Sequence, residues 1–154
     1  MKKVSTLVLS LLMISSAILG AENKTVDEYR ADLTSEDDQV VMDAATALGQ
    51  KKSKDAMDDL IEVIKTHENP QVRIRVADTL GRMGTKEQPT NALNDVIQND
   101  EDNAVVYAAL LAILNLGDFG NPSAEEAIDF CEQNKSDDPY ITDVVKRLRE
   151  AMKK

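Results

Sequence analysis

The amino-acid sequence predicts an all-α protein built from about three and a half repeated helix pairs. Residues 39–49 align with residues 71–81 at an offset of 32, and residues 60–64 align with residues 93–97 at an offset of 33. Apolar residues within each copy recur at helical spacing, and no stretch alternates as a half-buried strand requires. A repeat in the range of about 20–50 residues is one supersecondary unit that stacks on its neighbours.

The N-terminal segment, residues 1–21, has the three-part form of a bacterial secretory signal peptide. Two lysines precede an apolar run over residues 4–19, and two small residues, Gly20 and Ala21, follow it. The run is short for a membrane span, which needs about 20 apolar residues. The predicted cleavage site has no cysteine for a lipid anchor. We therefore expect a periplasmic protein that does not insert into the membrane after the signal is removed.

Residues 22–34 are expected to form an N-terminal capping helix, and residues 35–154 the repeat domain. Thr25 and Glu28 have the spacing of a capping box, in which each residue satisfies a backbone N–H of the other. A short helix at this point suits a repeat protein, because terminal units must cover an otherwise exposed core.

Helix starts in the repeat copies carry a capping residue followed by proline. The pairs are Asn69–Pro70, Asn121–Pro122 and Asp138–Pro139. The capping oxygen accepts a backbone N–H that has no partner within the helix, and proline suits the first helical position. Ser53 is expected to cap the second helix of the first copy. Glycines are expected at helix ends that need a left-handed backbone, namely Gly49, Gly81, Gly84, Gly117 and Gly120.

The third copy is looser, and a half copy ends the chain. Residues 116–120 align with residues 80–84 at an offset of 36, and residues 138–148 repeat the start of a copy. The last helix, residues 140–154, is basic near its end, which suits a helix C-terminus. Its contrast with the acidic body also permits head-to-tail self-association, although a capping role accounts for the same residues.

The second copy resembles the HEAT-like repeat family. Residues 69–84 contain a turn, the pair Val72–Arg73, small residues, and a Leu-Gly-x-x-Gly sequence. The resemblance covers roughly residues 35–154. It implies a right-handed α-solenoid, an ARM/HEAT-type superhelix, in which the second helix of each pair lines a concave face. Proteins of this family mostly bind other proteins, although the fold alone decides little about function.

The copies differ in an arginine that the family often uses to connect successive repeats. The second copy has Arg73 at this position. The other copies have Val41, Val106 and Thr142 there instead. The resemblance therefore implies an inter-repeat arginine at Arg73 alone.

Composition excludes several classes of function. The chain has 28 acidic and 18 basic residues and a net charge of −10, and removal of the two signal-peptide lysines would make it −12. Such a protein is a poor ligand for nucleic acid or for anionic membranes. One histidine and one cysteine leave little material for a catalytic triad or a zinc site, and a single thiol cannot form an intramolecular disulfide. Without a cofactor or catalytic motif, we expect no cofactor and no enzymatic activity.

A few residues invite a chemical role. His67 can be read as a metal ligand or an acid–base group, but no second His or Cys lies near it in the sequence, and a cation-capable residue near a helix C-terminus is the favoured interpretation. Cys131 falls on the apolar side of its helix, as a buried small residue does. The acidic runs at residues 36–38, 100–102 and 137–138 lack the ligand spacing of a calcium loop. They lie where acidic side chains stabilise the start of the next helix.

The second helices carry the candidate binding residues. With their apolar positions in the core, the remaining positions face outward and would line the concave face. These partner-binding candidates are Asp58, Asp59, Glu62, Lys65, Asn91, Asp95, Gln98, Glu126, Phe130 and Gln133. Two interpretations stay open for them. Phe130 is either an interface anchor or packs under the last helix, and the acids are either a binding surface or ordinary solvated surface.

The sequence thus favours an exported, non-enzymatic protein–protein interaction module, a scaffold or adaptor of the bacterial cell envelope. Its acidic concave surface would bind a protein with a basic surface, and electrostatics would set the association rate and selectivity. The alternative is a periplasmic regulator or carrier that binds a small ligand or a divalent cation through surface carboxylates.

Overall fold

The computed structural model describes residues 24–153, which form eight α-helices and one 3₁₀ helix. The predictions for residues 1–21 lie outside the described residues. The helices are α2 (Val26–Asp32), α3 (Asp38–Gln50), α4 (Met57–Thr66), α5 (Pro70–Met83), α6 (Gln88–Asn99), α7 (Asn103–Leu116), α8 (Pro122–Asn134) and α9 (Pro139–Met152), with the 3₁₀ helix η1 (Lys54–Ala56) before α4. No strand occurs within residues 24–153, and the predicted all-α class is confirmed.

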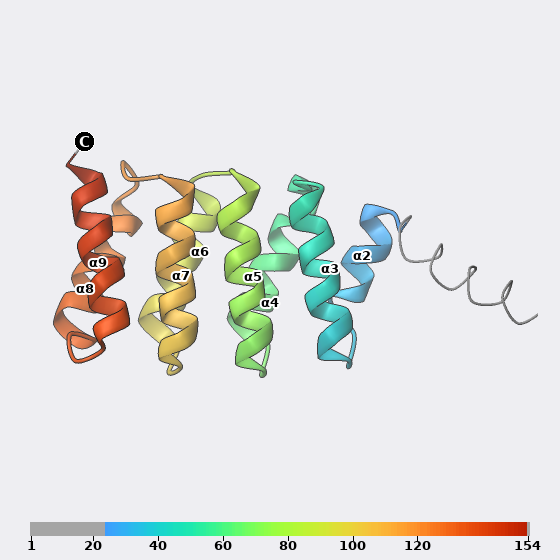
Figure 1. Cartoon of the computed structure of the whole chain (residues 1–154). Coiled ribbons are helices and arrows are strands. Elements are labelled where there is room, and N and C mark those ends of the chain that lie inside the picture. Colours follow the sequence, from blue (N-terminus) through green and yellow to red (C-terminus); the bar gives the residue numbers. More distant parts are fainter. Residues whose placement is uncertain (1–23, 154) are drawn as a thin grey trace, which may run out of the picture.

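The helices stack in two layers (Figure 1). The first-helix layer contains α3, α5, α7 and α9 side by side, and the second-helix layer contains α4, α6 and α8 behind them. Consecutive helices contact one another within each layer, and α2 packs against α3 at one end of the stack. Three helix pairs, followed by the single helix α9, give the α-solenoid that the repeats predict.

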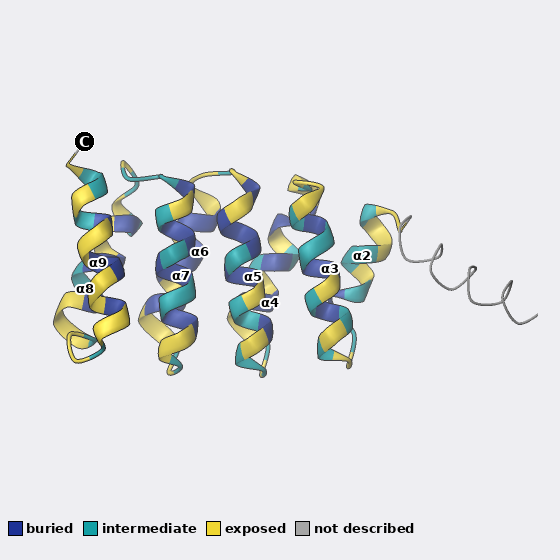
Figure 2. Ribbon diagram, viewed as in Figure 1, coloured by how far each residue is buried: buried dark blue, intermediate teal, exposed yellow. Residues whose placement is uncertain are grey.

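One continuous core lies between the layers. Figure 2 shows buried segments along the helices where the layers meet. Leu48, Leu80, Leu93 and Ile113 are among the side chains that are fully buried. Burial of such a side chain stabilises the fold by about 1.5–3 kcal/mol. Leu80, the leucine of the Leu-Gly-x-x-Gly sequence, is one of these core residues.

Acidic and amide side chains cap the helices, as the capping patterns predict. Asn69, Asn121 and Asp138 each accept a hydrogen bond from the backbone N–H two residues later, at 2.8, 3.0 and 2.9 Å. Asp37 and Asp102 do the same without a following proline, at 2.9 and 2.8 Å. Three of the acidic runs between helices therefore supply caps, which satisfy backbone donors that have no partner within the helix.

The two remaining capping predictions have opposite outcomes. The Thr25 and Glu28 capping box is present: the Glu28 N–H donates to Thr25 Oγ1 at 3.2 Å, and the Thr25 N–H donates to Glu28 Oε2 at 2.7 Å. The prediction for Ser53 is wrong, because its side chain makes no capping hydrogen bond. The chain enters α4 through η1, and the Ala56 N–H bonds to the Ser53 carbonyl oxygen at 3.3 Å instead.

Left-handed glycines end two helices of the first layer. Gly84 (φ 72°) and Gly117 (φ 60°) are the C-caps of α5 and α7, as predicted. A residue with a Cβ is strained in this conformation. Gly120 has no positive φ and has open space around it, so the prediction of a left-handed end is wrong there.

The predictions for Gly49 and Gly81 are also wrong, because both glycines lie inside helices. Their role is close helix packing within the first layer. A Cβ at Gly81 would lie 2.8 Å from the Cα of Ala112 in α7. A Cβ at Gly49 would lie 2.7 Å from the Cγ2 of Thr79 in α5. These glycines let α3, α5 and α7 approach one another.

Candidate functional site

Charge is divided unequally between the two layers. The second-helix layer carries eight Asp or Glu residues and one Lys, whereas the first-helix layer carries five acidic and six basic residues. Charges of one sign on a surface create a field that attracts a partner of the opposite sign. We call the solvent-facing side of α4, α6 and α8, with the ten predicted binding residues, the second-helix face.

On α4, three of the four predicted residues are exposed: Asp58, Glu62 and Lys65. Asp59 is half-buried, and its Oδ2 accepts a hydrogen bond from Arg30 Nε of α2 at 2.5 Å. That hydrogen bond raises the pKa of Arg30. Asp59 therefore connects α2 to α4, and its negative charge is partly neutralised by Arg30.

On α6, the predicted residues Asn91, Asp95 and Gln98 are all exposed. Lys65 Nζ from α4 donates to Asp95 Oδ2 at 2.6 Å. Gln98 Nε2 donates to the Oδ1 of Asn94 in the same helix at 2.9 Å. Asn94 itself is buried, so the exposed Gln98 is held in place by a hydrogen bond to a buried residue of its own helix.

On α8, Glu126 and Gln133 are exposed, as predicted. Glu126 Oε2 accepts a hydrogen bond from Asn94 Nδ2 of α6 at 3.0 Å. Phe130 is half-buried and packs against the core. It therefore resembles a packing residue more closely than an exposed anchor, in keeping with the second of the two interpretations left open for it.

Polar contacts join successive helices of this face. Three contacts connect α2, α4, α6 and α8 in turn. They are the ion pairs of Arg30 with Asp59 and of Lys65 with Asp95, and the hydrogen bond between Asn94 and Glu126. Exposed ion pairs of this kind contribute about 0–1 kcal/mol each to stability. They connect the side chains of adjacent repeats along this face.

Helix α8 carries an acidic cluster that is not among the predicted binding residues. Arg149 of α9 lies 3.5 Å from Glu125 and 2.9 Å from Glu132, and it also pairs with Asp129. The hydrogen bond from Arg149 lowers the pKa of Glu132. The i, i+4, i+7 spacing of the three acids placed them on one side of α8, but nothing in the sequence identified Arg149 as their partner.

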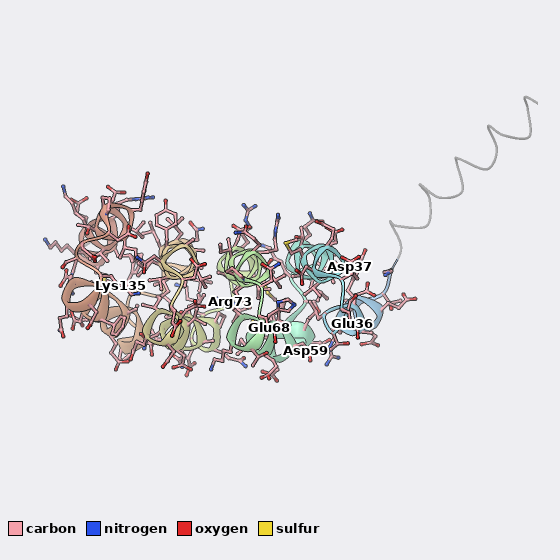
Figure 3. The ribbon with its side chains drawn as sticks, turned by 90° about the horizontal axis from the view of Figure 1, so that it is seen from below. Glu36, Asp37, Asp59, Glu68, Arg73 and Lys135 are labelled. Atoms are coloured by element: carbon pink, nitrogen blue, oxygen red, sulfur yellow. The ribbon has the colours of Figure 1, made fainter. Side chains whose placement is uncertain are left out.

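Arg73 makes the predicted connection between repeats. Its Nε and Nη2 donate to the two carboxylate oxygens of Asp100 at 2.7 and 3.0 Å, and its Nη1 donates to the carbonyl oxygens of His67 and Glu68, both at 2.8 Å. It thus joins the loop after α4 to the loop after α6, and Figure 3 shows it between the two layers. Val41, at the equivalent position of the first copy, is fully buried in the core.

A cleft of about 570 Å³ opens beside this arginine, where α4 and α6 end. Its walls include Lys65 and Asp95 on one side and Arg73 and Asp100 on the other. All four charges are already paired with one another across the repeats. The cleft is therefore a polar hollow between repeats and holds no free charge among these four to bind a ligand.

The single histidine and cysteine have structural positions. His67 ends α4, and its Nε2 lies 3.7 Å from Asp38 Oδ1. Cys131 is buried, and burial raises the pKa of its thiol to about 11. Between residues 24 and 153, no three His, Cys, Asp or Glu side chains lie close enough together to hold a metal ion. None of the helices in that span is long and apolar enough to cross a membrane.

A comparison with protein-family profiles matches residues 27–114 to the family described as HEAT repeats. The match covers more than half of the chain and runs from α2 into α7. A comparison with curated proteins gives no match. HEAT repeats generally mediate protein–protein interaction and are typically non-enzymatic scaffolds. The chain has repeated helix pairs and an inter-repeat arginine, in agreement with the family profile. The chain belongs to the HEAT-repeat family.

Proposed function

We propose that this protein is an exported interaction module, a scaffold or adaptor of the bacterial cell envelope, that binds a partner protein with a basic surface. The second-helix face, which we take as the concave side of the solenoid, is the binding surface. The protein is not an enzyme in this proposal. Its mechanism is the presentation of an ordered acidic surface, which speeds association with a basic partner and selects against acidic ones.

The observation that carries this proposal is the separation of charge between the layers. Eight of the nine charged residues on α4, α6 and α8 are acidic. Arg149 neutralises part of the α8 cluster, so the strongest candidates for direct contact lie on α4 and α6. Glu62 is exposed, and its carboxylate makes no hydrogen bond or ion pair within residues 24–153. It is therefore the first residue to test.

Export is supported by the signal-peptide pattern of residues 1–21. Mass spectrometry of the protein isolated from its own cells, together with osmotic-shock fractionation, tests it. Cleavage near Ala21 and release with the periplasm are the expected results. An intact N-terminus on protein retained in the cytoplasm would contradict the proposed location.

Affinity capture tests the partner and the face together. The tagged protein is mixed with envelope extract of the source bacterium, crosslinked mildly, and recovered at low and moderate salt. One stoichiometric protein partner is expected. Its recovery should fall as salt rises, because exposed charges are screened over about 10 Å at 0.1 M salt.

A matched pair of substitutions identifies the face. Glu62→Lys and Glu150→Lys make the same change in net charge at exposed glutamates, one on the second-helix face and one on α9 of the other layer. We expect partner recovery to fall with Glu62→Lys and to stay near the wild-type level with Glu150→Lys. Equal losses would show that net charge alone matters, which would contradict the proposed surface.

Binding of a small ligand or a divalent cation remains the alternative. A melting screen with Mg²⁺, Ca²⁺ and Mn²⁺ tests it, because a ligand that binds only the folded state raises the melting temperature in proportion to its affinity and concentration. A rise specific to one ion, and absent with equal ionic strength of a monovalent salt, would favour this alternative over the adaptor.

A further inference from the structure

Helix α7 is apolar on two sides. It contains no charged residue, and its core side is fully buried. On its outward side, Ala104 is exposed, and Tyr107, Ala108 and Leu111 are half-buried. Figure 2 shows α7 largely buried or half-buried on the side where α9 is mostly exposed. A helix that is apolar all round is normally covered on all sides. Within residues 24–153 this outward side is covered only in part, because Tyr107, Ala108 and Leu111 pack against the core and keep part of their surface exposed.

A groove runs between α7 and α5 on this side. Its volume is about 330 Å³, and Ile74, Tyr107, Ala108 and Leu111 are among the residues that line it. Asp78 of α5 is the one charged residue in its lining. We call this the α5–α7 groove.

Tyrosines extend the apolar surface toward α9. The rings of Tyr107 and Tyr140 meet edge to face, with centroids 6.3 Å apart. A second hollow of about 220 Å³ lies beside them. Tyr140 is 72% exposed, and no other large hydrophobic residue between 24 and 153 is exposed. An apolar centre with tyrosines and few charges is the usual composition of the middle of a protein interface.

The charges around this surface are nearly balanced. Arg73 and Arg149 have partners elsewhere. The other basic residues of α5, α7 and α9 are Arg75, Arg82, Lys146 and Arg147. The acidic residues of these helices are Asp78, Asp143 and Glu150, and Asp138 lines the second hollow. Residues 24–153 as a whole carry 27 acidic and 15 basic residues. Two copies of the protein that approach by other sides therefore meet strong like charge, and this side is where that repulsion is least.

We propose that the α5–α7 groove and the outward side of α7 bind a second copy of this chain, forming a two-fold symmetric dimer. Symmetric contact brings the same surface from both copies together, so each surface must be complementary to itself. A largely apolar centre, with Asp78 as the one charged residue of the groove lining and both signs of charge around it, meets that requirement. In the dimer, the first-helix layers lie back to back and both second-helix faces point outward.

Dimerisation gives the proposed adaptor two binding faces. This consequence rests on the proposed function, whereas dimerisation itself does not. Two linked faces bind a partner with repeated sites more tightly than one face does. The two interactions should also respond to salt in opposite directions. Salt screens the attraction between the acidic face and a basic partner, but it also screens the net repulsion between two acidic copies.

Light scattering after size-exclusion chromatography, with sedimentation equilibrium, tests the proposal. The whole chain is purified in the N-terminal form that the cell leaves, in reducing buffer, and measured from about 1 to 300 μM, which brackets micromolar dissociation constants. A reversible dimer is expected, with a dissociation constant that falls as salt is raised from about 0.05 to 0.5 M.

Two alanine substitutions provide the test and its control. Ala104→Glu places a charge from each copy near the centre of the proposed interface, and Ala31→Glu places the same charge on an exposed alanine of α2. Ala104→Glu should raise the dissociation constant of the dimer by about tenfold or more, while Ala31→Glu should leave it within about twofold. Because both alanines are exposed, both variants should keep the wild-type circular dichroism spectrum.

Three results would overturn the dimer. The first is a monomer at every concentration and salt, which would leave the groove to a foreign apolar segment. The second is an equal effect of the two substitutions, which would place the contact elsewhere. The third is a dimer that weakens with salt, which would point to head-to-tail contact between the basic end of α9 and the acidic body. Because no basic partner is present in this measurement, a result that contradicts the dimer does not contradict the proposed acidic binding face.

Discussion

Replacing Gly81 by valine tests how closely the first-helix layer is packed. A Cβ at this position would lie 2.8 Å from the Cα and 3.0 Å from the Cβ of Ala112. Real Cβ atoms do not approach backbone atoms of another helix so closely, and the obstacle is the α7 backbone, which cannot rotate away as a side chain can. Helices α5 and α7 must therefore separate, which disturbs the largest helix contact in the layer.

The size of the effect follows from two opposing terms. Extra methyl groups in a well-packed contact typically cost about 1–3 kcal/mol, and occasionally more. The better helix propensity of valine returns only a few tenths of a kcal/mol. We expect Gly81→Val to lower the free energy of unfolding by about 2 kcal/mol or more, and the melting temperature by about 5–10 °C.

Chemical and thermal denaturation followed by far-UV circular dichroism measures this loss. Gly120→Val is the matched control, because Gly120 has an ordinary φ and open space around it. It should change the free energy of unfolding by less than about 0.5 kcal/mol. A loss of the same small size for Gly81→Val would refute the close approach of α5 and α7.

Three further predictions concern the core, the inter-repeat arginine and acid stability, all read from unfolding free energies. Leu80→Ala should cost about 2–5 kcal/mol, since Leu80 is fully buried, and a cost below about 0.5 kcal/mol would contradict its placement. Arg73→Ala should cost about 3 kcal/mol because it leaves the largely buried Asp100 unpaired, whereas the exposed Arg82→Ala should cost less than about 0.5 kcal/mol. Burial raises the pKa of Asp118, but hydrogen bonds to its carboxylate outweigh burial and leave the pKa lowered. Its contribution is therefore present above its unfolded pKa and lost as pH falls through the folded value, so the stability gap between wild type and Asp118→Asn should narrow as pH falls from about 7 to 3.

Local chemistry made the helix boundaries predictable. The Asn–Pro and Asp–Pro pairs act through atoms two residues apart, and each starts a helix as expected. Glycine is harder to interpret, because it serves both a left-handed turn and a close helix contact. Gly84 does the first and Gly81 the second, although they lie in the same Leu-Gly-x-x-Gly sequence. The distinction depends on which residue of a distant helix lies opposite, and that is tertiary information.

The residues of the candidate face were also predictable from local sequence, but their contacts with other helices were not. Helical spacing placed Asp58, Glu62 and Asp95 outward, as the structure has them. It could not show that Asp95 pairs with Lys65 one repeat earlier. Spacing within a helix predicts the direction of a side chain. Whether the charge of that side chain is paired depends on a residue from another repeat.

Helix α7 shows why the opposite surface escaped the sequence analysis. Helical periodicity identifies the buried side of a helix by contrast with a polar side, and α7 offers no such contrast because it has no charged residue. Only its neighbours decide which apolar residues are covered. In the stack, α5 and α9 leave Tyr107 and Leu111 half-buried at the surface of an otherwise acidic protein. Both side chains also pack against the core, so folding accounts for their inner part, and only the part that stays exposed is left for association to explain.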